Sequence, residues 1–226
     1  MGIDKNYVIR ISEDAAIQLI LNALEAHSVF HPGKKKAQTC LETYGLLWGH
    51  EIRHSMNKII YSIELISIDT SANRTGNSVD PNDSSLKLKR NLMTAFWPYY
   101  EFLGDVHTHP YNKNYSYVVG KKYYNYSPDD FKRLENHSPY WEEHNYRVGL
   151  VLTIARMDRA GPKEHYYKQE NMIEFTLDKY RLWLKGYVLY EENEDGETKK
   201  VLKVTDHNAG NVFLDCPSLV GLKPII

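Results

Sequence analysis

The chain has 226 residues, of which 42% are hydrophobic and 25% are charged, and its formal net charge is −1. This composition is ordinary for a globular protein with a sizeable core, and it predicts one large domain or one domain with an appendage. The near-zero charge excludes a global electrostatic drive toward nucleic acid or an anionic membrane, so we expect neither as a partner. Two cysteines make no disulfide framework and the N-terminal segment has no secretory signal pattern, which predicts a cytoplasmic protein.

The N-terminal third is predicted to hold a strand, a helix and two further strands. Residues 7–11 alternate like a strand, and Ser12 is typical of the N-cap of the helix that follows, whose apolar residues recur at helical spacing. The mostly apolar segment 39–49 is predicted to be a strand, although it contains the carboxylate of Glu42. Residues 58–68 are predicted to pair with it in antiparallel orientation.

The middle of the chain begins with a polar segment, residues 69–83, whose many turn formers predict a surface loop. A helix is predicted from about residue 82 to 97, and residues 101–107 are predicted to form a strand. The candidate core contacts of that helix are Leu86, Leu88, Leu92, Met93 and Phe96.

A tyrosine-rich loop, residues 111–126, is predicted to lead into a second capped helix. Ser127 is its expected N-cap and Pro128 its first residue, a position where the missing N–H costs nothing. Residues 146–155 predict an interior strand, and residues 172–177 predict another.

The alternation of strands and helices predicts an α/β fold with a mixed β-sheet flanked by helices. We expect a main domain over residues 1–185. Residues 186–226 are expected to form a C-terminal extension packed on it, with a β-hairpin whose strands flank the turn signal Asp195-Gly196.

Two histidines at the end of the strand over 101–107 suggest a metal site. Residues two apart in a strand point to the same side, so His107 and His109 can face one ion. Asp130, on the first turn of the helix capped by Ser127, can supply a third ligand. Three protein ligands leave the fourth position of a zinc ion open, as catalytic zinc sites do, so we expect one Zn²⁺ per chain.

Catalysis at such a site needs a base and a group that stabilises the oxyanion. Glu42 is the candidate base because a carboxylate among apolar neighbours is costly unless it is paired or close to a metal. The alternative is that Glu42 faces solvent on the polar side of its strand. The Ser127 hydroxyl has two interpretations: it caps the helix, or it stabilises a developing oxyanion.

Other metal hydrolases also carry two histidines at this spacing. An amidohydrolase-type barrel would need many more strands after the pair than residues 110–226 can supply. A metallo-β-lactamase-type site would want an acid two residues after the second histidine, where Tyr111 stands.

Together these residues resemble the JAMM, or MPN-plus, metalloprotease family. The family pattern is a glutamate in an apolar strand, then HxHP, then SxxD. The matching positions here are Glu42, the run from His107 to Pro110, Ser127 and Asp130, with Gly45 and Gly104 agreeing in the flanks. The resemblance covers about residues 7–180. It implies that His107, His109 and Asp130 hold zinc while Glu42 and Ser127 are catalytic.

The resemblance departs from the family in the distance between His109 and Ser127, which is longer here. Residues 111–126 are therefore interpreted as an insertion, because the alternative serine, Ser116, has Val119 where the aspartate should be. The insertion is either a flap that shapes the substrate groove or a surface loop packed on itself.

By this resemblance the protein is expected to be a zinc-dependent isopeptidase. It would hydrolyse the amide bond after the C-terminus of ubiquitin or a ubiquitin-like protein through a zinc-bound water activated by Glu42. The substrate would be a ubiquitin-like protein or its conjugate, and proteins of a conjugation pathway are possible further partners. Two alternatives stay open: a zinc hydrolase of peptides or small amides, and an inactive scaffold of the same fold.

Overall fold

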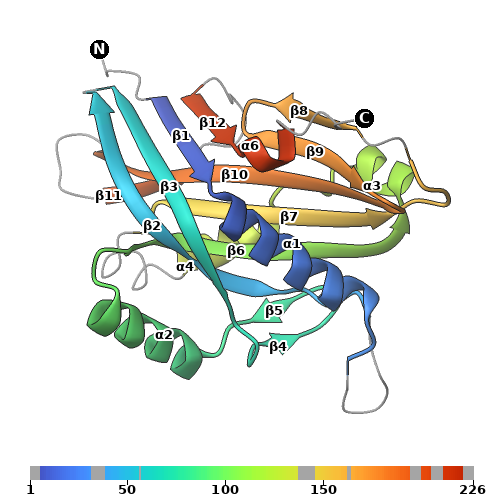
Figure 1. Ribbon diagram of the computed structural model, residues 1–226, viewed down its shortest axis with the longest axis horizontal. Helices are drawn as coiled ribbons and strands as arrows, with labels where there is room; N and C mark the ends of the chain where they lie inside the picture. The colour runs from blue at the N-terminus through green and yellow to red at the C-terminus, as the bar shows by residue number, and fades with distance from the viewer. Residues whose placement is uncertain are drawn as a thin grey trace.

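The computed structural model describes residues 6–31, 39–55, 57–136, 146–161, 164–193, 200–204 and 211–220 (Figure 1). The strands are β1 (Asn6–Ile11), β2 (Tyr44–Ser55), β3 (Lys58–Ile68), β4 (Asn73–Arg74), β5 (Val79–Asp80), β6 (Glu101–Asn114), β7 (Val148–Arg156), β8 (His165–Gln169), β9 (Met172–Leu177), β10 (Tyr180–Asn193), β11 (Lys200–Val204) and β12 (Val212–Asp215). The helices are α1 (Glu13–Ser28), α2 (Asp83–Phe96), α3 (Tyr115–Lys121), α4 (Pro128–Asn136) and α6 (Pro217–Val220).

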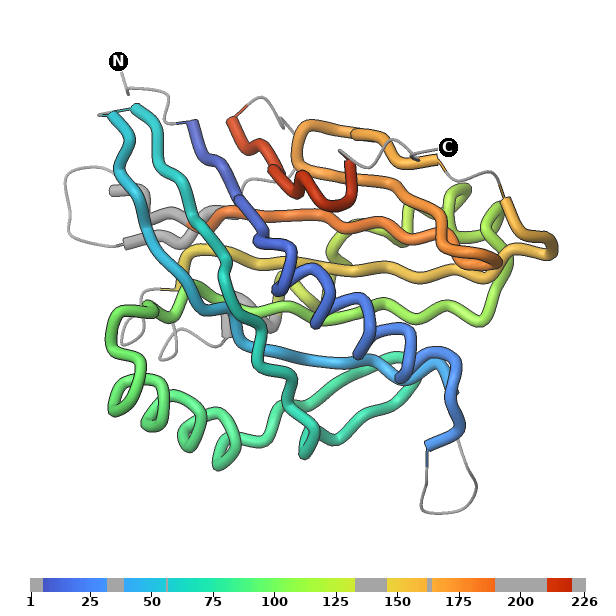
Figure 2. The backbone as a smooth tube through the Cα atoms, in the orientation of Figure 1, coloured from blue at the N-terminus to red at the C-terminus, as the bar shows by residue number. Residues whose placement is uncertain are grey.

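One mixed sheet organises the chain, in the order β12-β1-β3-β2-β6-β7-β10-β9-β8, with β11 paired to β10. The pairs β1–β12, β1–β3 and β6–β7 are parallel, and the other described pairs of this sheet are antiparallel. The predicted mixed α/β class is thus confirmed. The smooth trace in Figure 2 shows the sheet curling, with α1 across one face.

The face under α1 holds the main core. Ser12 caps the helix by accepting a hydrogen bond from the backbone N–H of Ala15, as predicted. The predicted helical stripe is buried against the sheet, including Leu19 and Ala23. Together with Ile9 and Leu150 these side chains belong to one continuous apolar cluster, which fixes α1 to the sheet.

The predicted helix α2 is confirmed, with Asn82 as its N-cap. Only part of its predicted core is buried: Leu86 and Met93 pack against strand residues such as Trp48. Three predicted core contacts are wrong, because α2 touches the molecule along a narrow stripe and leaves their side chains outward. These exposed residues are Leu88, Leu92 and Phe96.

A bulge at Gly104 decides which way the following side chains of β6 point. Gly104 has φ of 149°, and a Cβ there would lie 1.8 Å from the backbone oxygen of Val148 on β7. Only glycine permits this approach. Beyond the bulge, Val106 belongs to the core under α1, while His107 and His109 occupy the alternate positions and point to the other face.

The predicted strand over residues 39–49 is wrong at its beginning. β2 starts only at Tyr44, and Cys40 has a positive φ of 54° that interrupts an extended chain. The N–H of Cys40 donates to the His27 carbonyl and that of Leu41 to the Ala26 carbonyl, both at the end of α1, instead of to a neighbouring strand. Glu42 therefore lies in an irregular segment that precedes the strand.

Residues 111–126 are more regular than the predicted loop. β6 continues to Asn114, because its extension pairs with β7, and α3 follows directly. The predicted surface loop over 69–83 likewise contains a small hairpin, β4–β5.

The predicted domain boundary after residue 185 falls inside β10. The C-terminal segment also supplies β12, which pairs with β1. The predicted hairpin is formed by β10 and β11, and its Asp195-Gly196 turn lies outside the described residues. Among the described residues, no helix combines the length and apolarity needed to cross a membrane.

Candidate metal centre

The two histidines and the aspartate predicted to bind metal meet at one point. The Nε2 atoms of His107 and His109 are 3.1 Å apart. The two carboxylate oxygens of Asp130 lie 3.2 Å from His107 Nε2 and 3.3 Å from His109 Nε2. Both histidines are buried and Asp130 is largely so, and the three residues form a group that could hold a metal ion.

These distances fit a zinc ion. Ligand atoms about 2.0–2.1 Å from a tetrahedral zinc ion are about 3.3 Å from one another, which is close to the separations observed here. Two imidazole nitrogens and a carboxylate oxygen are also donors that zinc accepts in catalytic sites. The chemistry and the spacing of these donors therefore fit a metal of this class.

The start of α4 holds Asp130 by a reciprocal pair of hydrogen bonds. The Asp130 N–H donates to Ser127 Oγ at 3.1 Å, and the Ser127 N–H donates to Asp130 Oδ2 at 2.6 Å. The predicted cap is thus present. It uses a lone pair of the Ser127 oxygen, so the hydroxyl hydrogen remains a possible donor, and the two predicted roles of Ser127 do not exclude each other.

Burial and mutual contact shift the titration of the three ligands. Burial raises the pKa of Asp130, but its bonds to His107 and His109 dominate and hold that pKa well below the usual range. Burial lowers the pKa of His109, and contact with Asp130 only partly offsets it. Burial lowers the pKa of His107 as well, but Asp130, Asp105 and Glu42 together outweigh it and raise that pKa overall. The ionised carboxylate of Asp130 and the lowered pKa of His109 suit metal binding, whereas a metal ion must compete with a proton at His107.

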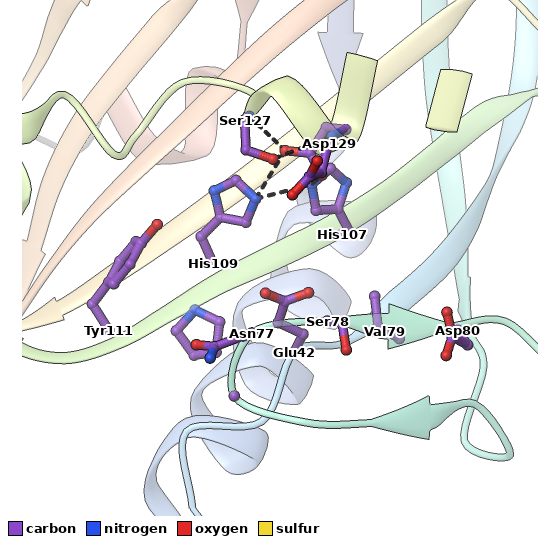
Figure 3. A pocket seen from close by; sticks show the side chains of 13 residues that line it. Glu42, Asn77, Ser78, Val79, Asp80, His107, His109, Tyr111, Ser127 and Asp129 are labelled. Carbon is purple, nitrogen blue, oxygen red and sulfur yellow. Dashed lines mark hydrogen bonds and ion pairs between the residues drawn. The ribbon is translucent and has the colours of Figure 1, made fainter. Parts of the chain in front are cut away.

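Glu42 lies across a cleft from these ligands, in the same cavity of about 370 Å³ (Figure 3). Its carboxylate points toward the histidines, and its negative charge contributes to the raised pKa of His107. Glu42 is 9% exposed, so the solvent-facing alternative is not what the structure has.

Two hydrogen bonds from backbone N–H groups, one to the β4–β5 hairpin and one to β6, hold the Glu42 segment across the cleft from the metal ligands. Its N–H donates to the Thr75 carbonyl in the β4–β5 hairpin at 2.8 Å. The next residue, Thr43, donates its N–H to Thr108 Oγ1, also at 2.8 Å. Because Thr108 stands between the two histidines, this bond fixes the Glu42 segment relative to the metal ligands.

The β4–β5 hairpin forms the rest of the wall opposite the metal ligands. Its residues 76–80 line the cleft together with Glu42. The hairpin projects from a loop whose two ends are joined by Asp69. Asp69 accepts from the N–H and hydroxyl of Ser71 and from the N–H of Asn82, which joins the two ends of the loop.

The tyrosines of the 111–126 segment divide between the cleft and the sheet. Tyr111 lines the cleft, where its ring stacks on Tyr123 at 5.2 Å and meets the ring of His109 edge-on at 6.3 Å. Tyr124 and Tyr126 are instead buried against the sheet. The segment thus anchors its buried tyrosines on the domain and contributes one side chain, that of Tyr111, to the cleft.

The sequence did not reveal the polar residues that surround the histidines. Asp105, two residues before the first ligand His107, accepts hydrogen bonds from the hydroxyls of Tyr44 and Tyr146. Tyr187 contacts the residue before Ser127 from β10. The even spacing of residues 105, 107 and 109 signals the first of these groups, whereas nothing in the local sequence marks Tyr187.

Comparisons with known proteins give no family for this chain. No family model matches it, and no curated protein matches. Among solved structures, the chain is similar to the solution structure of protein DSY2949 from Desulfitobacterium hafniense, with 14% sequence identity, 92% of each chain covered and a TM-score of 0.45.

Proposed function

We propose that this protein is a zinc-dependent hydrolase of amide bonds, most specifically an isopeptidase or peptidase that cleaves after the C-terminus of a ubiquitin-like protein. The observation that carries the proposal is that Glu42 faces the cluster of His107, His109 and Asp130 across one cleft. A buried carboxylate next to an open metal site is the arrangement that hydrolysis by an activated water requires.

His107, His109 and Asp130 would hold the ion, which when bound supplies a Lewis acid and lowers the pKa of nearby water to about 7. Glu42 accepts the proton of the attacking water and returns it to the amine that leaves, because an amine leaves poorly without a proton. The Ser127 hydroxyl donates a hydrogen bond to the oxygen that becomes negative on attack.

The substrate class rests on the resemblance to the JAMM family and on the charge of the cleft. Four carboxylates line it, those of Glu42, Asp80, Asp129 and Asp130, and its described lining includes no lysine or arginine. Even with the charge of +2 that a bound zinc ion would add, four carboxylates leave the lining negative, which favours a peptide segment that carries positive charges near the scissile bond. An isopeptide or internal peptide bond suits such a cleft because it places no free carboxylate at the cleavage point.

A second candidate is the hydrolysis of short peptides or small amides. The cleft volume of about 370 Å³ favours it, because this lies in the lower part of the range of small-molecule sites. The two candidates share their chemistry and differ in whether recognition extends beyond the cleft.

The test uses purified full-length protein with its metal removed by a chelator and restored with zinc. We expect about one zinc per chain and cleavage of fusions to ubiquitin-like proteins only in the zinc-loaded form. His109→Gln should lose zinc affinity by at least about 100-fold, whereas His54→Gln, at an exposed histidine, should retain it. Cleavage of short peptides but not of fusions would favour the second candidate. Zinc-loaded protein that cleaves neither would contradict the proposed enzyme and leave a binding scaffold.

A further inference from the structure

Three side chains on one face of strand β10 contact the chain just before Ser127. The ring of Trp183 lies 5.8 Å from that of Tyr124. Lys185 donates from Nζ to Asn125 Oδ1 at 2.8 Å. The next side chain of the same face, Tyr187, contacts Tyr126 by a hydrogen bond and by ring stacking. Three alternate residues of β10 thus contact three consecutive residues, 124–126.

Tyr187 makes the contact nearest to the metal ligands. Its hydroxyl oxygen accepts the backbone N–H of Tyr126 at 2.8 Å, and the two rings stack at 3.8 Å. Tyr126 in turn contacts a metal ligand, because the centroid of its ring lies 5.4 Å from that of His107. Phe131, the neighbour of Asp130, packs edge-on against Tyr126 at 5.6 Å.

The position of Asp130 depends on this contact because the connecting chain is short. Tyr126 directly precedes Ser127, and Ser127 exchanges two hydrogen bonds with Asp130. A shift of the Tyr126 backbone therefore moves the cap, and with it the carboxylate that must reach both histidines. A residue that fixes this backbone acts on the metal through Asp130.

We propose that Tyr187 is a positioning residue for the metal centre: by accepting the Tyr126 N–H, its hydroxyl holds the Ser127–Asp130 turn in the geometry that binds the ion. The proposal rests on the proposed metal site and extends it to a strand that supplies none of its ligands. Without the hydroxyl, the buried N–H of Tyr126 has lost its acceptor, and the turn relieves this by moving away from the metal-binding geometry. The measured zinc affinity is then reduced in proportion to the fraction of molecules that still have that geometry.

The test compares the zinc affinity of full-length wild-type protein, Tyr187→Phe and Tyr61→Phe by titration against a competing chelator. Tyr187→Phe keeps the ring and the stacking, so it isolates the hydroxyl. Tyr61 is a control of the same type, a buried tyrosine that stacks on Tyr7 in the sheet away from the site. We expect zinc affinity about tenfold lower for Tyr187→Phe and unchanged for Tyr61→Phe. The melting temperature of the metal-free proteins separates a general loss of stability from this effect.

A second measurement uses the wild-type protein alone, so that it stands even where the variant fails to fold. Because coupling is reciprocal, zinc should slow hydrogen exchange of the Tyr126 amide. Equal zinc affinity of wild type and Tyr187→Phe, or exchange of Tyr126 that ignores zinc, would overturn the role of Tyr187 while leaving the metal site intact. Wild-type protein that binds no zinc would instead overturn the metal site itself.

Discussion

The two walls of the cleft are built by different means. The metal wall takes its ligands from positions close in sequence on β6 and α4, and its aspartate is fixed by a cap within one turn. The opposite wall carries Glu42 in an irregular segment that is held by backbone bonds to Thr75 and, through Thr43, to Thr108. Local bonds thus orient the ligand carboxylate within its own turn, which Tyr187 of β10 contacts from a distance in sequence, whereas Glu42 is placed by bonds between distant segments.

This difference separates two properties of the site. Metal binding at the proposed site needs only the metal wall, because none of the three candidate ligands comes from the opposite wall. In the proposed mechanism, turnover needs both walls at a fixed separation, since Glu42 must reach the water that attacks the substrate. Changes in the second wall should therefore lower turnover or stability without removing the metal.

The largest effect is expected from Glu42→Gln. The amide keeps the shape of the side chain but cannot take a proton, so turnover should fall by about 10³-fold. Zinc content should stay at that of the wild type, because Glu42 is not a ligand. Steady-state kinetics and metal analysis of the same sample check this, with Glu101→Gln, at an exposed position, as the control. Loss of zinc in Glu42→Gln would show that the two walls are not separable.

Ser127→Ala tests the metal wall from within. Removal of Oγ takes the acceptor from the Asp130 N–H, which should cost about 1 kcal/mol of unfolding free energy. If the hydroxyl also donates to the oxyanion, turnover should fall by about 100-fold. Denaturant unfolding and kinetics measure the two effects separately. Ser127→Thr retains both the acceptor and the donor and should recover both, whereas a loss of stability alone in Ser127→Ala would leave Ser127 as a cap only.

The difference between the walls also explains what could be predicted from the sequence. Alternation along β6 and the cap spacing at α4 are local, so His107, His109, Ser127 and Asp130 were predicted, and the structure places them together. The segment around Glu42 was mistaken for a strand, because nothing local reveals the bonds from residues 40 and 41 to the end of α1.

Burial on one side of an element was equally hard to predict. Leu88 fits the apolar spacing of α2, yet it faces outward, because the width of the contact between α2 and the sheet depends on the tertiary arrangement. Tyr187 could not be predicted for a related reason. Its partner, Tyr126, is distant in sequence, and only the order of strands brings the two together.

Asp69→Asn should loosen the second wall alone. Asp69 is buried and joins the two ends of the loop that carries the hairpin, through bonds from Ser71 and Asn82. Bonds to a charged acceptor are worth more than neutral ones, so we expect a loss of about 2 kcal/mol of unfolding free energy at neutral pH. Zinc affinity should not change. Asp80→Asn, at an exposed position of the hairpin, should leave stability within about 0.5 kcal/mol of the wild type.

The pH dependence of this loss gives an independent check. Burial alone would raise the pKa of Asp69, but the bonds from Asn82 and Ser71 hold it below its usual value. A lowered folded-state pKa stabilises the protein above the unfolded pKa of about 3.9, and this contribution disappears as the pH falls through the folded-state value. The stability difference between wild type and Asp69→Asn should therefore shrink on acidification below about pH 4. A difference that stays constant would mean that the charge of Asp69 contributes nothing to the wall.

The smallest effect is expected at a buried hydroxyl of the metal wall. The Tyr126 hydroxyl is buried without a hydrogen-bond partner among the described residues, and it lies so close to Gly149 that a Cβ there would be 2.0 Å from the oxygen. Burial and the charge of Asp105 raise the pKa of Tyr126, so the phenol stays neutral. Tyr126→Phe removes a buried polar group that gains nothing in return, and the unfolding free energy should be unchanged or higher by up to about 1 kcal/mol. Tyr146→Phe is the matched comparison, because that hydroxyl donates to Asp105, and its loss should destabilise the protein. Denaturant unfolding of the two variants decides the point: a clear loss of stability in Tyr126→Phe would show that its hydroxyl, like that of Tyr187, helps to hold the metal wall.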